Sequence, residues 1–221
     1  MSDRQAFLDK VRAAVRQGNH AGNTPPLPQR DGVGYQGGGM DPARRFVEML
    51  EAAGGFGHLV ADDTDAIAEV LALVERLQPR RVLLGSESIV AKFDLANQLL
   101  ARDCEIARAT ELIEGGGRER FFAADLAITG VDYLIAETGT MIMLARPEQP
   151  RTASLLPPVH IAIAERAQIL PDLFDLYDCL DPQAMLSCVT HITGPSKTGD
   201  IELKLVTGVH GPGEVHVVVI G

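Results

Sequence analysis

The chain contains no tryptophan, only three cysteines and fewer basic than acidic residues. Aromatic residues make up 5% of its 221 positions, and 30 acidic against 20 basic side chains give a formal net charge of −10. Nucleic-acid surfaces combine clustered Lys and Arg with aromatic stacking platforms, so this composition argues against a nucleic-acid partner. No apolar stretch approaches the ~18 residues that a membrane-spanning helix requires, and we therefore predict no membrane span.

The cysteines are Cys104, Cys179 and Cys188, which are widely spaced and include no C-x-x-C pair. Iron–sulfur clusters and zinc ribbons need about four well-placed ligands, usually thiolates. We therefore predict that this chain holds no cofactor of its own and that its cysteines are small buried hydrophobic residues. The six histidines form no H-x-x-H or H-E-x-x-H pair, so we predict no zinc site.

The first forty residues differ in composition from the rest of the chain. Residues 4–17 carry apolar side chains at helical spacing, which predicts an amphipathic helix. Residues 18–39 are rich in Gly, Pro and Asn and predict a flexible arm. We predict an N-terminal helical arm over residues 1–40 and a main domain over residues 41–221. The first residues lack the basic start and apolar centre of a secretory signal, so we expect a cytoplasmic protein.

The main domain alternates strand-like and helix-like segments. This rhythm predicts an α/β fold with a mostly parallel sheet flanked by helices. Residues 126–145 are nearly continuous strand material, and the interruption at residues 137–140 predicts two strands joined by a tight turn. We expect the remaining strands at residues 56–61, 81–85, 105–109, 159–164, 186–193 and 215–220, and helices at residues 41–53, 64–77 and 89–102.

The most specific signal lies in residues 190–221, where we expect an apolar strand, a loop, a short helix and a final strand. Ligands in α/β proteins are usually held at such a strand-to-helix loop, where the first turn of the helix offers unpaired N–H groups to an anion. The small, hydroxyl and basic residues of this loop are the predicted ligand-binding residues Gly194, Ser196, Lys197 and Thr198.

Two acidic residues leave other interpretations of this loop open. Asp200 is suited to cap the expected helix and Glu202 to lie in its first turn, where both compete with a bound anion. The loop could therefore bind a ligand or simply start a well-capped helix. A third interpretation uses Asp200, Glu202 and His210 to bind Mg²⁺ through hard ligands.

A second group of candidate residues lies in the middle of the chain. Glu137 stands at the expected turn, where an exposed carboxylate could act as nucleophile or base. Its neighbours in the turn are predicted to contact the ligand, and they are Thr138, Gly139 and Thr140. Arg151 is a natural partner for a carboxylate substrate, whereas His160 could bind a ligand or be a satisfied core histidine.

These blocks together resemble the LUD-domain family over about residues 40–221. The resemblance rests on residues 137–140, 154–157 with His160, 194–196, 200–202 and 208–212. It implies a fold like that of sugar-phosphate isomerases and CoA transferases. It also implies a part in oxidising L-lactate to pyruvate beside iron–sulfur partner subunits, and it assigns no catalytic residue to this chain.

We therefore expect the non-cluster subunit of a cytoplasmic lactate-oxidising system, which binds a small anionic ligand, its iron–sulfur partners, or both. One rival is a free-standing acyl- or CoA-transfer enzyme in which Glu137 forms the covalent intermediate. The other rival is a ligand-binding or assembly module without catalysis.

Overall fold

The computed structural model describes residues 3–18, 34, 36–112, 118–146, 149–181, 187–198 and 206–221. The chain divides into two units, residues 1–35 and residues 36–221. The first unit contains the helix α1 (Asp3–Gly18), which confirms the amphipathic helix expected there. Its apolar side chains Phe7, Val11 and Val15 are exposed.

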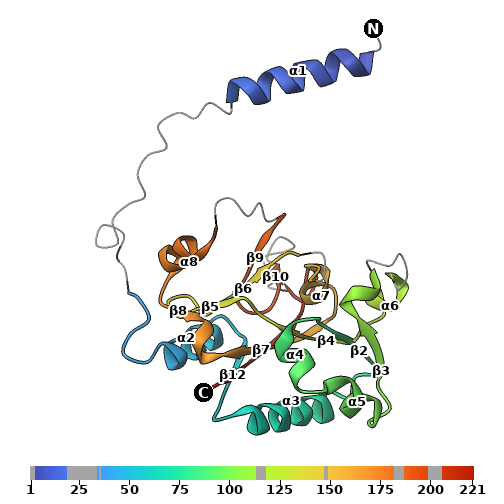
Figure 1. Cartoon of the computed structure of the whole chain (residues 1–221), viewed down its shortest axis with the longest axis vertical. Coiled ribbons are helices and arrows are strands. Elements are labelled where there is room, and N and C mark those ends of the chain that lie inside the picture. Colours follow the sequence, from blue (N-terminus) through green and yellow to red (C-terminus); the bar gives the residue numbers. More distant parts are fainter. Residues whose placement is uncertain are drawn as a thin grey trace. The chain divides into compact units, whose positions relative to one another are not determined.

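The second unit is built on a six-stranded sheet in which every neighbouring pair is parallel. This confirms the predicted α/β class, and Figure 1 shows the sheet at the centre of the unit. The strands lie in the order β1 (Phe56–Val60), β12 (Glu214–Ile220), β7 (Val159–Glu165), β4 (Leu126–Gly130), β2 (Arg81–Leu84) and β3 (Glu105–Arg108).

One face of this sheet is covered by three helices, which lie together in Figure 1: α3 (Asp63–Leu77), α4 (Ser88–Lys92) and α5 (Leu95–Leu100). The single helix expected over residues 89–102 was wrong. The chain breaks at Asp94, whose φ of 47° is left-handed and ends the helical path. Asp is among the few residues that tolerate this conformation.

The other face packs on α2 (Pro42–Ala52), on the short helices α6 (Arg118–Phe122) and α7 (Thr152–Leu155), and on a second sheet. Helix α2 begins as its sequence predicts, because the Asp41 side chain accepts a hydrogen bond from the Arg44 N–H and Pro42 occupies the first turn. Successive residues of a strand point to opposite faces, and both faces of this sheet are buried. That explains the continuous apolar runs of its strands.

The second sheet has the order β8 (Ile169–Leu170), β5 (Tyr133–Ile135), β6 (Thr140–Leu144) and β9 (Val189–Ile192). Strands β5 and β6 form the expected antiparallel pair around the turn. The prediction of two strands in residues 126–145 was wrong in number, because β4 belongs to the main sheet and the chain changes sheets after Gly130. Helix α8 (Leu173–Cys179) covers the outer side of the second sheet.

The remaining elements are short. The 3₁₀ helices η2 (Ala109–Leu112) and η3 (Arg166–Gln168) connect larger elements. Strand β10 (Lys197–Thr198) pairs antiparallel with β11 (Val206–Thr207). Lys197 and Thr198 are thus strand residues, and the short helix expected from Asp200 lies outside the described residues. No helix in the described part of the chain is both long and apolar enough to cross a membrane.

Candidate functional site

The structure brings two of the predicted blocks together at the C-terminal end of helix α2. Gly139 adopts a φ of +65°, and a Cβ atom there would overlap the backbone N of Leu50. Gly194 has a φ of +76°, and its Cβ would lie 2.9 Å from the carbonyl oxygen of Ala53. Both positions therefore require glycine for close packing on the helix.

A row of threonine hydroxyls links the same two blocks. The Oγ1 atoms of Thr138 and Thr140 are 2.6 Å apart, and those of Thr140 and Thr193 are 2.7 Å apart. Thr140 is buried, whereas Thr193 is exposed. The row therefore connects the β5–β6 turn to the start of the residue 194–198 loop.

Glu137 stands half-buried beside this row. Its Oε1 accepts a hydrogen bond of 3.0 Å from the backbone N–H of Gln36, and its own N–H donates to the carbonyl of Pro171 at 3.1 Å. The carboxylate is thus hydrogen-bonded to the chain that leads into α2. This geometry fixes the turn, and a chemical role for Glu137 stays a prediction.

The polar groups of the predicted C-terminal loop are used by neighbouring protein atoms. The Lys197 ammonium donates to the carbonyl of Ala53 at the end of α2. The Ser196 N–H donates to the carbonyl of Pro212 at 2.8 Å, and its Oγ accepts from the His210 N–H at 3.4 Å. These groups are therefore not free for an anion in this arrangement. Asp200 and Glu202 lie outside the described residues.

Arg151 and His160 lie apart from these blocks in the described contacts. Arg151 is exposed, with Nη1 3.9 Å from the Sγ of Cys188. His160 is fully buried in β7, where its Nε2 lies 2.8 Å from the Oγ1 of Thr129. Burial lowers the pKa of His160 to about 4, so its ring is neutral at pH 7. This favours the interpretation of a core histidine.

A different cluster, absent from the predicted residues, lies where strands β2 and β4 end. These strands are neighbours in the sheet, yet the chain leaves β2 toward α4 and α5 on one face and leaves β4 toward the second sheet on the other. Ligands of open parallel sheets bind in the crevice at such a switch point. The topology therefore points to the carboxyl ends of β2 and β4.

Glu87 fills this crevice. A Cβ atom on Gly85 would overlap its carboxylate, and a Cβ atom on Gly130 would lie 2.9 Å from the Glu87 Cβ. The pKa of Glu87 is raised, mainly because the carboxyl group is buried, and the charge of Asp132 raises it further. Hydrogen bonds from the backbone at Glu87 and Gly130 act in the opposite direction and lower this pKa. A carboxyl group with a raised pKa in a crevice is a candidate acid, base or ligand contact.

Two polar side chains act on Glu87, and a third, Arg146, holds both of them. The Gln149 amide faces the carboxyl and slightly opposes the rise of its pKa. Arg146 joins the other two, because Nη1 donates to Oε1 of Gln149 at 2.8 Å and Nη2 lies 2.7 Å from Oδ1 of Asp132. Asp132 Oδ2 also accepts the Leu144 N–H at 2.6 Å. Arg146 thereby fixes both groups in front of Glu87.

Two cavities lie near the end of β2. One of about 290 Å³ is lined by Gly85, Ser86 and residues of α4, α5 and β3. The other, of about 390 Å³, is lined by Glu87, Ser88, Ile89, Lys92, Val131, Glu165 and Gln168. Glu87 is the member of the cluster that lines the second cavity, and its carboxyl oxygens are themselves buried.

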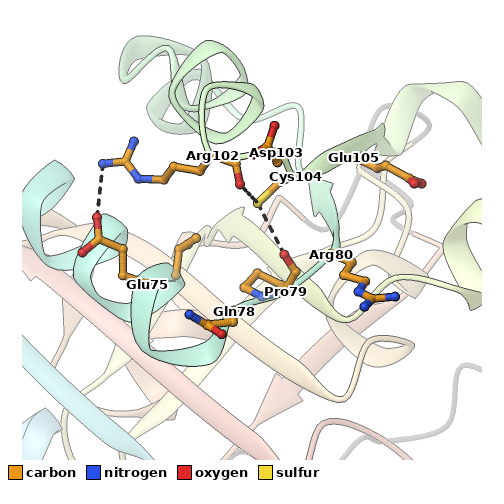
Figure 2. A pocket seen from close by; sticks show the side chains of 9 residues that line it. Glu75, Gln78, Pro79, Arg80, Arg102, Asp103, Cys104 and Glu105 are labelled. Atoms are coloured by element: carbon orange, nitrogen blue, oxygen red, sulfur yellow. Dashed lines mark hydrogen bonds and ion pairs between the residues drawn. The ribbon is translucent and has the colours of Figure 1, made fainter.

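A larger cavity of about 690 Å³ lies at the opposite, amino ends of β2 and β3 (Figure 2). There Arg102 reaches Glu75 at 3.4 Å, and the Sγ of Cys104 points to the carbonyl of Pro79 at 3.4 Å. Its position is opposite to the edge at which parallel sheets bind ligands. The topology therefore favours the switch point as the ligand site, although this cavity is larger.

Within the described ranges, no group of three or more His, Cys, Asp and Glu side chains is arranged to hold a metal ion. The pattern of the LUD domain matches residues 43–220. The chain belongs to the LUD domain family.

Its relatives include proteins named lactate utilization protein C. The relative from Anoxybacillus flavithermus is 32% identical over 142 residues, which are 63% of this chain and 62% of that protein. The relative from Halalkalibacterium halodurans is 34% identical over 147 residues, with the same shares of both chains. This LUD protein therefore covers less than two thirds of either relative. The relative from Macrococcus caseolyticus is 33% identical over 178 residues, 76% of this chain and 74% of that protein.

A solved structure, the crystal structure of a DUF162 family protein from Deinococcus radiodurans, superimposes with a TM-score of 0.55. It covers 80% of this LUD protein and 95% of the Deinococcus chain at 20% identity. At this identity the likeness shows the shared fold and no more.

The LUD-domain sequence contained a signal for the cluster that our sequence analysis missed. Glu87 follows Gly85 after a buried strand, and Asp132 follows Gly130 in the same way. The rule that ligands lie beyond the carboxyl ends of parallel strands selects both residues when it is applied to every strand.

Proposed function

We propose that this chain is the subunit without iron–sulfur clusters in a cytoplasmic system that oxidises L-lactate to pyruvate. The observation that carries this proposal is its LUD domain together with relatives named lactate utilization protein C. Its role is to bind a small anionic ligand, the iron–sulfur partner subunits, or both.

The positions of the cysteines support electron transfer by partner subunits. Cys104 is buried next to the start of β3, whereas Cys179 at the end of α8 is exposed and Cys188 before β9 is half-buried. The prediction of buried cysteines was therefore wrong for Cys179 and Cys188. The three cysteines lie on separate elements, and the described residues hold no group suited to a metal. Because a cluster needs about four convergent ligands, we place the clusters on the partners.

A growth experiment tests the proposal in the organism that encodes the chain. Deletion of the gene should abolish growth on L-lactate and leave growth on pyruvate intact, and the wild-type gene should restore it. Affinity purification at native expression should recover iron-containing partner subunits. Unimpaired growth of the deletion strain on L-lactate contradicts the proposal.

The Glu137→Gln variant separates the proposed subunit from an acyl- or CoA-transfer enzyme. A covalent intermediate needs the carboxylate oxygen as nucleophile, so the amide would abolish activity in a transferase. In the proposed subunit, the introduced amide keeps an oxygen that accepts the Gln36 N–H, and growth on L-lactate should persist. The exposed Glu119→Gln variant is the matched control.

A further inference from the structure

We propose that Arg108 and Asp94 form a binding site for a short 2-hydroxy acid in the cavity at the carboxyl ends of β2 and β3. In this site Arg108 binds the carboxylate, and Asp94 accepts the hydrogen bond of the hydroxyl group. The site follows from the cavity and from the charged side chains that line it. The choice of a 2-hydroxy acid among small hydroxylated anions rests on the proposed function.

The cavity lies where two loops leave the main sheet on opposite faces. After β2 the chain runs to α4 and α5 on one face, and after β3 it runs through η2 to α6 on the other. Because β2 and β3 are parallel neighbours, both loops begin at the same edge of the sheet. Ligands of open parallel sheets bind in a crevice beyond the carboxyl ends of the strands, and the cavity of about 290 Å³ has this position.

The register of the sheet places Arg108 at this cavity. Arg108 is the Cα partner of Leu84, so both side chains lie on the face that α4 and α5 cover. Both residues line the cavity, and Arg108 is exposed, so a ligand can reach it. Its backbone N–H donates to Glu111 at 3.2 Å, but no group in the described part of the chain pairs with its guanidinium. Such a guanidinium is suited to bind a carboxylate through two parallel hydrogen bonds.

Asp94 supplies a hydrogen-bond acceptor at the same cavity. It is exposed and lies between α4 and α5, where its φ of 47° breaks the helical path. The side-chain amide of Asn97 orients its carboxylate, with Nδ2 2.9 Å from Oδ1 and 3.0 Å from Oδ2. A carboxylate oxygen has two lone pairs, so Asp94 can still accept a hydrogen bond from a ligand. Non-glycine residues with left-handed backbone cluster at ligand sites, and the position of Asp94 agrees with this tendency.

The two charges together select the chemistry of the ligand. Arg108 attracts an anion, whereas Asp94 attracts a hydrogen-bond donor and repels further negative charge. A monoanion with a hydroxyl group next to its carboxylate satisfies both residues, and a doubly charged phosphate does not. A 2-oxo acid presents a carbonyl oxygen in place of the hydroxyl, and two acceptors then face each other without a proton. The site should therefore prefer a 2-hydroxy acid to the corresponding 2-oxo acid.

The neighbouring cavity of about 390 Å³ is less suited to an anion. Lys92 lines it, but the ammonium group lies 2.6 Å from Asp63 and 3.9 Å from Glu165. Glu87 and Glu165 line the same cavity and add negative charge. Electrostatics therefore favours the cavity that Arg108 lines. Its volume of about 290 Å³ is at the lower end of the usual range for ligand pockets, roughly 300–1,000 Å³, which suits a short acid.

The test is isothermal titration of the full-length chain at pH 7 with L-lactate, pyruvate and inorganic phosphate. Wild type should bind L-lactate at least about tenfold more tightly than pyruvate, and phosphate more weakly than L-lactate. Arg108→Met keeps the apolar stem and removes the charge. It should weaken the binding of both acids at least about tenfold, because the charge-assisted hydrogen bonds to the carboxylate are lost.

The Asp94→Asn variant tests the second half of the site. Asparagine tolerates the left-handed φ as aspartate does, and its amide offers a donor as well as an acceptor. The variant should bind pyruvate at least as tightly as wild type does, and its preference for L-lactate should shrink by about tenfold. Damage to the fold would weaken the binding of both acids, so it does not produce this change in the ratio of affinities.

Arg80→Gln is the matched control, because Arg80 is an exposed arginine that lines the larger cavity at the amino ends of β2 and β3. It should bind as wild type does, and circular dichroism should show that each variant is folded. Arg108→Gln replaces the methionine variant if that one does not fold. The inference is overturned by no binding of L-lactate, by equal affinities for the two acids or by tighter binding of phosphate. Unchanged affinity after the Arg108 substitution, or an unchanged preference in Asp94→Asn, overturns it as well.

The outcome is separable from that of the growth experiment. A deletion strain that grows normally on L-lactate removes the proposed function, while titration still decides whether the cavity binds 2-hydroxy acids. A clear growth defect combined with no binding of L-lactate overturns the inference alone.

Discussion

The side chain of Lys197 donates a hydrogen bond to the carbonyl oxygen of Ala53, 144 positions earlier in the chain. Ala53 is the C-terminal cap of α2, and the last carbonyls of a helix carry the negative end of its dipole. Lys197 therefore neutralises a helix end and ties β10 to α2. The positive charge that suggested an anion site in the sequence has a structural use.

Lys197→Met should lower the free energy of unfolding by about 0.3–1 kcal/mol, the usual contribution of a cation at a helix C-terminus. The apolar stem is retained, so the loss is that of the charge and its hydrogen bond. Urea denaturation at low and high salt measures it, and salt should shrink the difference. Lys10→Met in α1 is the control. A variant as stable as wild type at low salt would show that the contact contributes nothing.

Gly139→Ala should destabilise the domain by about 3 kcal/mol or more, because strain and overpacking add. The residue has a left-handed φ of +65°, and its new methyl group would overlap the backbone of Leu50. Backbone on a helix cannot move aside as a flexible side chain can. Gly211→Ala is the matched control, because its Cβ would make an ordinary contact of 3.5 Å with Ser196. Thermal unfolding of the two variants should differ clearly, and equal melting temperatures would contradict the predicted clash.

Local patterns predicted most of the main sheet and α2. The strands are buried on both faces and read as short apolar runs, and α2 carries its cap and its stop signal in adjacent residues. What the patterns could not give was which sheet each strand joins. β4 and β5 are separated only by Val131 and Asp132, and both read as strand; only long-range pairing assigns them to different sheets. The break at Asp94 was missed because its neighbours keep helical spacing on both sides.

The candidate site was less predictable for a related reason. The signals chosen from the sequence were glycines, hydroxyls and a lysine, and Gly139, Gly194 and Lys197 all prove to pack on α2. The same residue types are therefore typical of close packing and of ligand binding, and the sequence pattern does not distinguish the two. Glu87 stood out in neither composition nor spacing. Only the structure shows that Glu87 lies against Gly85 and Gly130, at the ends of the neighbouring strands β2 and β4.

Glu87→Gln should raise the melting temperature at neutral pH. Because the pKa of Glu87 is raised by burial, the unfolded chain releases this proton at lower pH than the folded chain does. The free energy of unfolding of wild type therefore falls as pH rises from the ordinary glutamate pKa, roughly 4.3, to the raised pKa of Glu87 in the folded chain. It stays at the lower value above that pH. Calorimetry from pH 4 to 8 should show the variant's advantage growing with pH. Glu119→Gln should give no such trend, and a wild type that gains stability relative to Glu87→Gln over this range contradicts the assignment.

His160 should make the opposite contribution at acidic pH. Its ring is fully buried in β7, Nε2 contacts Thr129, and Nδ1 is buried without a hydrogen-bond partner in the described structure. Its folded pKa of about 4 lies below the ordinary value of 6.5. Between these values the unfolded chain binds a proton that the folded chain does not, so stability falls as pH falls from 6.5 toward 4, by up to about 3 kcal/mol.

A His160→Gln variant isolates this contribution to the stability. The glutamine has no titrating ring, so the variant should lose less stability than wild type between pH 6.5 and 4. Its polar end can still bond Thr129, but it does not fill the space of the buried ring, so the variant should be less stable than wild type at pH 7. His58 and His216 also have lowered pKa values, through burial first of all, and they remain in both proteins. The difference between the two stability curves therefore reports His160 alone. Parallel curves would mean that the ring is protonated in the folded chain, which would require water or a ligand atom to reach Nδ1.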